Sequence, residues 1–438
     1  MRIDRLILDN FRCFEHLDLA LDERMTLLVG TNGAGKTAVL DGLAIALGAW
    51  LKSTTQGGHE DRPIDASDAR LVRQESAGLA TSNPTFPVRI SVVACPLDQA
   101  LEWAREIQSI DAGNHIRNNF ALMVAARRLG ADAAKNPESS LPLIAYYGTG
   151  RLWVQAQQPR QNEPFASRMR GYASCLAFAW DHELLNSWMA DREGDRLQRL
   201  AAVYAAGGDL ASVKSPHLEA VENAALACLE GARRFFYSIN HKELRVEFDN
   251  GQELPFSSLS DGQRGLIVLA ADLAWRAAQL NPHYGADAPR LTKGVVLIDE
   301  IELHLHPQWQ RTVIANLMRA FENVQFVMTT HSPQVVSTAQ PEWMRVLHPD
   351  GTWDRVDYTY GRDSNALLRD VFGIPDRLQD IRERVARVEE LLAGGDLLAA
   401  REALRQLEQD LGPNDDLVSG LRWEIADAET HGGGDAAG

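Results

Sequence analysis

Short apolar runs and helical periodicities divide most of this chain into strands and helices. Compact or alternating apolar residues predict strands at 3–14, 16–21, 25–29, 86–93, 141–147, 294–298, 325–328 and 344–347. Apolar residues at helical spacing predict helices at 37–47, over most of 99–135 and 167–236, from 259–263 through 275, and at 308–321. The pattern therefore predicts a first domain, with helical insertions at about 99–135 and 167–236, that ends near residue 350.

Three other stretches differ in character. Residues 52–84 are rich in Gly, Asp, Ser and Thr and are predicted to form a long loop. Asp249-Asn250-Gly251, between two apolar segments, predicts a β-hairpin at 244–256. After a connecting segment at 351–376, the charged amphipathic stretch 377–430 predicts three helices. We expect these helices at 377–393, 396–411 and 415–429, followed by a disordered tail at 431–438.

Composition and charge narrow the class of protein. The 438 residues, 45% hydrophobic and 24% charged, suffice for a full core and an accessory domain. No apolar run approaches the ~18 residues of a membrane span, and the N-terminus lacks the apolar core of a signal peptide. The four cysteines are far apart without a CxxC pair, so we expect reduced thiols in the cytoplasm. The net charge of −16 excludes a surface that is basic throughout, so nucleic acid would have to meet a local patch.

One loop near the N-terminus has the composition of a phosphate-binding loop. The segment Gly30-Thr31-Asn32-Gly33-Ala34-Gly35-Lys36-Thr37 matches GxxxxGK[ST] in full, between a predicted strand and a predicted helix. Its glycines let the backbone turn tightly, so that N–H groups can point at phosphate oxygens. Lys36 would neutralise the β- and γ-phosphates, and Thr37 would offer its hydroxyl to Mg²⁺. We therefore predict a nucleotide-binding loop made of Gly30, Asn32, Gly33, Ala34, Gly35, Lys36 and Thr37, and not a chance glycine turn.

A second motif places two carboxylates at the end of a predicted buried strand. Four apolar residues, 295–298, precede Asp299 and Glu300. Parallel sheets bind ligands at the carboxyl ends of their strands, so we expect Asp299 to hold Mg²⁺ and Glu300 to polarise an attacking water. An apolar strand that ends in Asp-Glu is common in proteins. It indicates a nucleotide site only because the same chain also contains the phosphate-binding loop.

Four motifs in combination resemble the ABC/SMC/RecF/OLD class of ATPases: the loop at 30–37, Leu-Ser-Asp-Gly-Gln at 259–263, Asp299-Glu300, and Thr330-His331-Ser332. The resemblance covers residues 1 to about 350 and implies an α/β fold. It implies an ABC-type ATPase head, with a mixed sheet, an antiparallel β-subdomain, helical insertions and a C-terminal helical tail. It also implies that Ser260, Gly262 and Gln263 reach the nucleotide of another subunit, and that His331 bonds the γ-phosphate. The cofactors implied are ATP and Mg²⁺, held within a head-to-tail dimer.

Three features are open to two interpretations. Arg12 ends the first strand, where related ATPases place residues near the adenine and phosphates, but it could equally be a surface arginine. No glutamine follows the strand at 141–147, where ABC proteins carry their Q-loop; either Arg151 substitutes, or this region is built differently. His304 and His306 could suggest a metal site, but without a third ligand nearby a structural role is the stronger interpretation.

A narrower resemblance, to the Septu-type ATPases of bacterial anti-phage defence (PtuA), rests on residues 145–153, 303–310 and 372–375. It implies higher oligomers and a separately encoded HNH endonuclease partner (PtuB-like), with DNA reached through that complex. OLD nucleases carry a catalytic domain after the histidine, and only about a hundred residues follow His331 here. We therefore expect an ATPase, with hydrolysis that can be slow, and no nuclease site in the same chain.

Two other functions compete with this one. A RecF/SMC-like DNA-repair ATPase would bind DNA directly, through Arg160, Arg168 and Arg170 or through Arg233, Arg234, Lys242 and Arg245. Charge clusters of this size are usually solvated faces, and the overall acidity weakens that hypothesis. A transporter ATPase subunit is disfavoured by the large insertions and the appended tail.

Overall fold

The computed structural model describes residues 1–54, 61–76, 79–97, 99–117, 119–152, 168–177, 182–375 and 377–432. It divides the chain into two compact units, Met1–Leu367 and Leu368–Gly438. The predicted basic residue Arg160 and most of the predicted disordered tail, residues 433–438, lie outside the described residues. Within the described residues, no helix has the length and apolar character needed to cross a membrane.

A six-stranded sheet forms the centre of the first unit. All strands but one edge strand run parallel, and every residue of the five parallel strands is buried. Parallel strands covered on both faces must be apolar along their whole length, which is why they appear as compact apolar runs in the sequence. In sheet order the strands are β16 (Trp353–Asp354, antiparallel), β15 (Met344–Leu347), β3 (Met25–Val29), β14 (Val324–Thr329), β13 (Gly294–Ile298) and β9 (Leu143–Tyr147).

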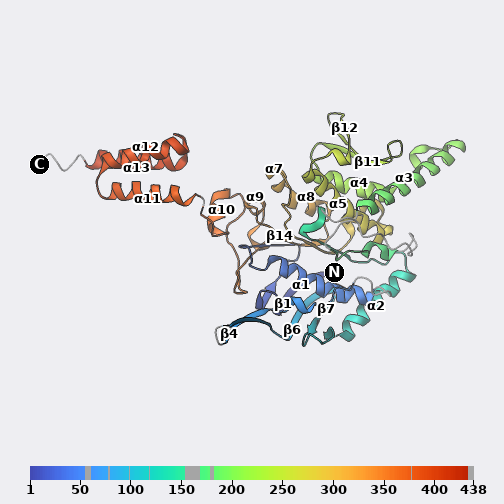
Figure 1. The fold of residues 1–438 in the computed structure, drawn as a ribbon. Coiled ribbons are helices and arrows are strands. Elements are labelled where there is room, and N and C mark those ends of the chain that lie inside the picture. The colour runs from blue at the N-terminus through green and yellow to red at the C-terminus, as the bar shows by residue number, and fades with distance from the viewer. Residues whose placement is uncertain are drawn as a thin grey trace. The chain divides into compact units, whose positions relative to one another are not determined.

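A second, antiparallel sheet lies across helix α1 (Lys36–Thr54) from the first. Helix α1 lies between the two sheets in Figure 1 and contacts strands of both, and most of its residues are buried. The resulting order of layers is the mixed sheet and antiparallel β-subdomain expected from the sequence, so the predicted fold class is confirmed. In order, the strands of the second sheet are β2 (Phe14–Ala20), β1 (Arg2–Phe11), β6 (Val88–Leu97), β7 (Gln99–Ile107) and β8 (His115–Arg117).

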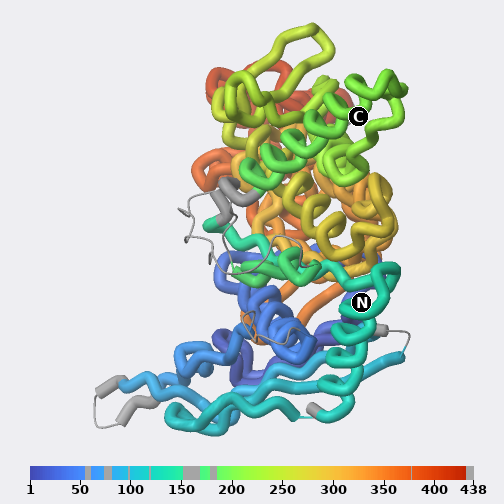
Figure 2. The backbone as a smooth tube through the Cα atoms, turned by 90° about the vertical axis from the view of Figure 1, so that its right-hand side faces the viewer, coloured from blue at the N-terminus to red at the C-terminus, as the bar shows by residue number. Residues whose placement is uncertain are grey.

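Helices cover the other face of the six-stranded sheet. Helices α4, α5 and α8 lie on the side opposite α1 in Figure 1, and the view of Figure 2 shows the same order of layers. Two small antiparallel sheets complete the unit: β4 (Leu71–Ser76) with β5 (Leu79–Pro84), and β10 (Ala232–Ser238), β11 (Glu243–Phe248) and β12 (Glu253–Pro255). The helices are α2 (Asn119–Lys135), α3 (His182–Ala205), α4 (Pro216–Cys228), α5 (Asp261–Leu280), α6 (Ala288–Leu291), α7 (Pro307–Gln310), α8 (Val313–Ala320), α9 (Pro333–Val336) and α10 (Ser364–Asp370).

The second unit is a small helical bundle with a core of its own. It contains α11 (Gln379–Ala393), α12 (Leu397–Leu411) and α13 (Asp416–Gly432), close to the three helices predicted from the sequence. A bidentate pair between Arg377 and Asp415, with both N–O distances at 2.9 Å, closes the bundle at one end. The core residues are Ile381, Val388, Ala400, Leu404, Leu407, Val418, Leu421 and Ile425.

Four predicted elements were wrong in part. Residues 99–135 were expected to be mostly helical, and α2 occupies 119–135, but 99–107 pair antiparallel with β6 and this long-range pairing overrides the local helical spacing. The loop predicted at 52–84 contains the β4–β5 hairpin, and the helical stretch at 167–236 ends in β10. The helix predicted at 308–321 is two short helices, α7 and α8, separated at Arg311 and Thr312.

Candidate nucleotide-binding site

The phosphate-loop segment joins β3 to α1 and folds around its own lysine. Lys36 is only 6% exposed, and its ammonium donates to the carbonyls of Gly30 at 2.9 Å and Thr31 at 3.1 Å. Gly35 adopts φ +92°, and a Cβ there would collide with the ring of Phe14 and lie 2.7 Å from the sulfur of Cys13. The turn between β1 and β2 thus packs directly on the loop, and only glycine fits at Gly35.

The charge of Lys36 faces a group of carboxylates. Burial lowers the pKa of Lys36, while Asp299, Glu300 and Glu302 act in the opposite direction and favour its charged form. The net shift is downward, which means that desolvation outweighs the three acids. A desolvated ammonium at the start of a helix is well suited to an anionic ligand, because the negative charge of a phosphate would offset the cost of burying the positive charge.

Asp299 lies at the centre of the site. It is 2% exposed, and its two oxygens accept from the hydroxyls of Thr37 at 3.0 Å and Thr329 at 2.6 Å. Its amide donates to the carbonyl of Tyr147 at 2.8 Å. The structure therefore brings together the two residues predicted to hold Mg²⁺, Thr37 and Asp299, which are 262 positions apart in the chain.

The spacing of these oxygens suits a magnesium ion. Mg²⁺ takes octahedral oxygen ligands at about 2.0–2.1 Å, so adjacent ligands lie about 2.9 Å apart. The Thr37 hydroxyl and the Asp299 carboxylate are 3.0 Å apart, and both are hard oxygen donors of the kind Mg²⁺ prefers. The residues present therefore fit the cation.

Glu300 has an unusual backbone. Its φ of +47° lies in the left-handed region, which a side chain with a Cβ rarely adopts. The hydroxyl of Thr329 accepts its amide N–H at 2.7 Å and, through the same oxygen, donates to Asp299. Strained conformations of this kind persist where surrounding contacts impose them, and they cluster at functional sites. Thr329 thus fixes both acidic residues, although the sequence showed it only as one of two threonines before His331.

His331 is attached to the segment that follows the two acids. Its amide donates to Glu302 Oε1 at 2.5 Å. The other oxygen, Oε2, is buried and has no hydrogen-bond partner within the described part of the chain. A buried carboxylate oxygen without a donor is costly, so this atom is a natural acceptor for a ligand-bound water or a donor from outside the chain. The sequence had assigned Glu302 no chemical role.

The segment Leu259–Gln263, here called the signature segment, forms the start of α5. Ser260 is the N-cap: its hydroxyl accepts the Gln263 amide at 3.3 Å, and Gln263 Oε1 accepts the Ser260 amide at 3.1 Å. This capping box occupies the Gln263 side chain, whose predicted contact with a nucleotide stays a prediction. A Cβ on Gly262 would lie 2.5 Å from the carbonyl of His304, so the glycine is also required for packing. A hollow of about 630 Å³ opens between this segment and residues 304–309.

The phosphate loop and the signature segment do not meet within one chain. Helix α1 lies between the two large sheets, whereas α5 lies on the opposite face of the six-stranded sheet (Figure 1). Within the described residues no hydrogen bond or ion pair joins residues 30–37 to residues 259–263. The predicted site residues therefore fall into two groups: Lys36, Thr37, Asp299, Glu300 and His331 lie at the carboxyl edge of the sheet, and Ser260, Gly262 and Gln263 lie apart.

Arg12 is ion-paired near the phosphate loop. It pairs with Asp41 of α1 and with Asp68, the latter at 2.9 Å, and its side chain is 33% exposed. Asp41 also accepts from Arg62 at 2.7 Å and from the Tyr146 hydroxyl at 2.9 Å. The contact of Arg12 with a nucleotide thus stays a prediction, and the side chain of Arg151, the Q-loop candidate, lies outside the description. His306 caps α7 by accepting the Gln308 amide at 3.3 Å, a structural role.

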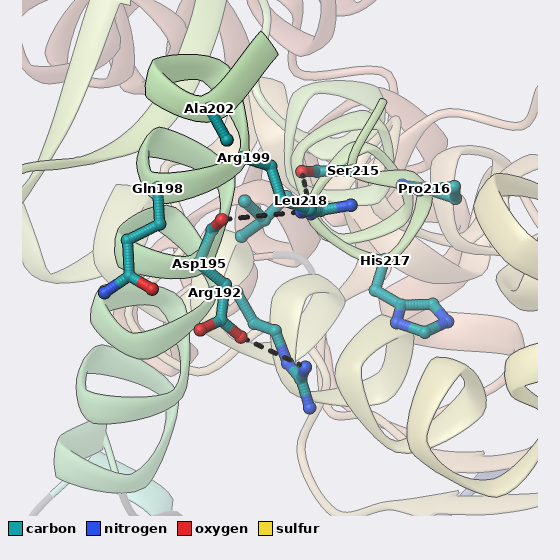
Figure 3. A pocket seen from close by; sticks show the side chains of 9 residues that line it. All are labelled: Arg192, Asp195, Gln198, Arg199, Ala202, Ser215, Pro216, His217 and Leu218. Atoms are coloured by element: carbon teal, nitrogen blue, oxygen red, sulfur yellow. Dashed lines mark hydrogen bonds and ion pairs between the residues drawn. The ribbon is translucent and has the colours of Figure 1, made fainter. Parts of the chain in front are cut away.

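A second hollow, of about 550 Å³, lies between α3 and the start of α4 and is drawn in Figure 3. Two arginines line it, and both are bonded to the chain itself: Arg192 pairs with Asp195 at 3.6 Å, and Arg199 donates to the Ser215 hydroxyl at 3.2 Å. No residue predicted for nucleotide binding lines it. This hollow is therefore separate from the site at the sheet edge.

Comparisons with known proteins agree with these motifs. Two family models match the chain, "AAA domain" over residues 5–202 and "AAA domain, putative AbiEii toxin, Type IV TA system" over residues 165–337. The "Retron Ec83 probable ATPase" of Escherichia coli is 26% identical over 97% of this chain and 86% of that protein. The "OLD nuclease" of Thermus scotoductus is 27% identical over 93% of this chain and 75% of that protein.

The chain is similar to ATPases of the ABC/SMC/RecF/OLD class. It also resembles the "Septu protein PtuA" of Bacillus thuringiensis, at 28% identity over 42% of this chain and 48% of that protein. A solved structure, the "SmcHead bound to the C-winged helix domain of ScpA", aligns over 82% of this ATPase and 98% of that chain, with 14% identity and a TM-score of 0.48. That likeness is too low to add to the fold described above.

Proposed function

We propose that this ATPase binds and hydrolyses ATP with Mg²⁺ and that two copies close head-to-tail around two nucleotides. The observation that carries the proposal is the hydrogen-bonded set of Thr37, Asp299, Thr329 and Glu300 beside Lys36. These residues come from two neighbouring strand ends and one helix start, where α/β sheets place their ligands. Their donors and acceptors match what a triphosphate with its metal requires.

The residues of the site would have separate roles in binding and hydrolysis. The amides of the loop from Gly30 to Gly35 and the ammonium of Lys36 hold the β- and γ-phosphates. The oxygens of Thr37 and Asp299 hold Mg²⁺, which when bound neutralises charge on those phosphates. The carboxylate of Glu300 orients the attacking water and accepts its proton, and His331 donates to the γ-phosphate.

The signature segment completes the site of a second copy. Ser260 and Gly262 border an open hollow and lie on the other face of the sheet from their own phosphate loop. A serine hydroxyl and the amides of a helix start are suited to phosphate oxygens, so we assign them the nucleotide of the partner head. A head-to-tail pair satisfies this twice by symmetry.

Glu300→Gln tests the head-to-tail assembly. The amide cannot accept the proton of the attacking water, so the variant should bind ATP, fail to hydrolyse it and remain a dimer in mass photometry with ATP and Mg²⁺. Lys36→Ala in the same background should stay monomeric, because it removes the phosphate contact. A Glu300→Gln protein that is monomeric at saturating ATP, with nucleotide bound, would refute the head-to-tail site.

We further propose that the closed pair gates a separately encoded HNH nuclease in bacterial anti-phage defence. The resemblance to Septu protein PtuA and to a retron ATPase supports this role. The second unit, 368–438, supplies a docking surface, since its eight arginines stand against sixteen Asp and Glu residues. An acidic surface of this kind attracts the basic surface of a DNA-cutting partner.

Removal of residues 377–438 tests the docking role. The bundle has its own core, so the truncated chain should keep the ATP affinity of the full chain and lose the nuclease in co-purification after co-expression. Partner binding that survives truncation would exclude the bundle as the docking surface. The expected lack of a nuclease site in this chain is tested on the purified ATPase alone, with plasmid DNA and divalent cations.

A RecF/SMC-like ATPase that binds DNA directly is the second candidate. Arg233 and Arg234 favour it, because their side chains are 70% and 52% exposed, although both pair with Glu247, at 4.0 and 3.6 Å. Arg168 and Arg245 are held more closely: Arg168 donates to the Leu280 carbonyl at 2.7 Å, and Arg245 pairs with Glu243 and Glu253. Salt-dependent binding of duplex DNA that Arg233→Glu abolishes would favour this candidate over the first.

A further inference from the structure

A buried polar triad joins strand β9 to the signature helix α5. The Tyr147 hydroxyl donates to Asp272 Oδ2 at 2.5 Å, and Arg276 Nε donates to the same oxygen at 2.8 Å. Tyr147, Asp272 and Arg276 are 5%, 3% and 6% exposed. Arg276 also donates to the carbonyls of Gly171 at 3.0 Å and Ala173 at 2.9 Å, which anchors it to the segment beside β9.

The same tyrosine touches the nucleotide-binding site through its backbone. The Tyr147 carbonyl accepts the amide of Asp299, whose carboxylate bonds the hydroxyl of Thr37. A single residue thus contacts the proposed metal ligand on one side and α5 on the other. Asp272 lies eleven residues after the first residue of α5, about 16 Å along the helix from the signature segment. Helices are stiff over such a length, so the position of Asp272 sets the direction of Ser260.

The triad is costly to bury and therefore specific in its geometry. Burial opposes the charge of Arg276, but Asp272 and Tyr147 outweigh it and hold the pKa of Arg276 above its ordinary value. Burial, aided by the Asp272 charge, raises the pKa of Tyr147, so its hydroxyl stays a donor. A desolvated ion pair is stable only when its hydrogen bonds are complete, so a shift of β9 relative to α5 would be resisted.

We propose that Tyr147, Asp272 and Arg276 are positioning residues that couple the nucleotide site of one head to the signature segment of the same head. Nucleotide bound at Asp299 and Thr37 fixes the end of β9, and the triad passes that position to α5. The signature segment is then oriented toward the nucleotide of the partner head. The inference rests on the proposed head-to-tail function and adds to it the residues that connect the two ATP sites.

Adjacent tyrosines give a matched test. Tyr146 is also buried, at 2% exposure, and its hydroxyl also donates to a carboxylate, Asp41 at 2.9 Å, but Asp41 belongs to α1. Tyr147→Phe and Tyr146→Phe therefore remove the same kind of hydrogen bond, and only the first cuts the connection to α5. Both are made in the full-length Glu300→Gln protein, and thermal unfolding reports the loss of stability in each.

Two quantities are measured for each variant. Fluorescent ATP gives the affinity of single heads, with Ser260→Arg added to prevent pairing, and sedimentation gives the dimer dissociation constant with ATP and Mg²⁺. Tyr147→Phe should weaken the dimer about tenfold, as expected for one lost bond to a charged group, and leave single-head affinity within about twofold. Tyr146→Phe should leave the dimer constant unchanged.

The outcomes separate this inference from the function beneath it. If the parent protein does not pair with ATP at all, the head-to-tail function fails. If the parent pairs, and Tyr147→Phe pairs as tightly as Tyr146→Phe, the positioning triad is refuted while the function stands. An equal loss of single-head ATP affinity and of pairing in Tyr147→Phe would also refute it, because the residue would then act on binding alone.

Discussion

Thr329→Val should separate nucleotide binding from hydrolysis. The Thr329 hydroxyl donates to Asp299 at 2.6 Å and accepts the amide of Glu300 at 2.7 Å. Valine has the same shape and β-branching, so strand β14 and its packing remain, and only these two hydrogen bonds disappear. Glu300 then loses a contact that holds its backbone at φ +47°.

The magnitude follows from the two bonds. A hydrogen bond to a charged group contributes about 1.5–3 kcal/mol, and an amide left buried without an acceptor costs about 1–3 kcal/mol. If about half of the sum of these two free energies appears as a higher activation barrier, because Glu300 is misplaced, kcat should fall by about ten- to a hundredfold. Each ~1.4 kcal/mol of barrier corresponds to a tenfold change in rate. Lys36 and the loop amides are unchanged, so ATP affinity should change by no more than about threefold.

Phosphate release and fluorescent-ATP binding measure the two effects. Thr330→Val is the matched control: Thr330 is also fully buried, but its hydroxyl accepts the Ser332 amide at 3.0 Å and touches neither acid. The control should lose stability without a comparable loss of kcat. If both valine variants hydrolyse ATP at the same rate, Thr329 does not organise the two carboxylates and the reasoning fails.

Three further predictions address the remaining groups of the site. Thr37→Ala should abolish the dependence of ATP affinity on Mg²⁺ measured against EDTA, whereas Thr37→Ser, which keeps the hydroxyl, should preserve it. Because the pKa of Lys36 is lowered, the loss of ATP affinity on raising the pH should begin below the ordinary pKa of lysine, as calorimetric titrations can measure. Between the lowered pKa of the folded chain and the ordinary pKa of the unfolded chain, only the unfolded chain keeps the proton, so the free energy of unfolding should rise with pH. Gly262→Ala, whose Cβ would lie 2.5 Å from the His304 carbonyl, should impair ATP-driven pairing in sedimentation, while Gly420→Ala, at an open helical position, should not.

The sequence predicted the central sheet well because its strands are buried on both faces. Apolar runs at 25–29, 294–298 and 344–347 coincide with β3, β13 and β15. The prediction was wrong at 99–107, where three of the nine strand residues are exposed and the strand's identity depends on pairing with β6. The pattern of apolar residues within one segment does not show which strand will pair with it. For 99–107 the local spacing therefore predicted a helix instead of a strand.

The candidate site divides in the same way. Residues that are consecutive in the chain, such as Lys36-Thr37 and Asp299-Glu300, could be recognised from their motifs. Thr329, Tyr147 and Asp272 could not, because their proximity depends on which strands are neighbours. One signal was available: Asp272 and Arg276 form an i,i+4 pair of opposite charges within the otherwise apolar helix at 266–278, a pattern that indicates a buried ion pair.

The strand order β9-β13-β14-β3 explains why Asp299 is the residue on which the site converges. Asp299 follows β13, and its neighbours on either side end at Tyr147 and at Thr329; the loop after β3 leads to Thr37. Each nearby strand end thus supplies one partner to the same residue, and a displacement of any of them must change the position of its carboxylate. Because Tyr147 also bonds α5, such a displacement cannot stay local to the metal ligands. Tyr147 and Thr329 lie at strand ends beside Asp299, outside the phosphate loop. We therefore expect substitutions at these two residues to change hydrolysis and pairing more than ATP affinity.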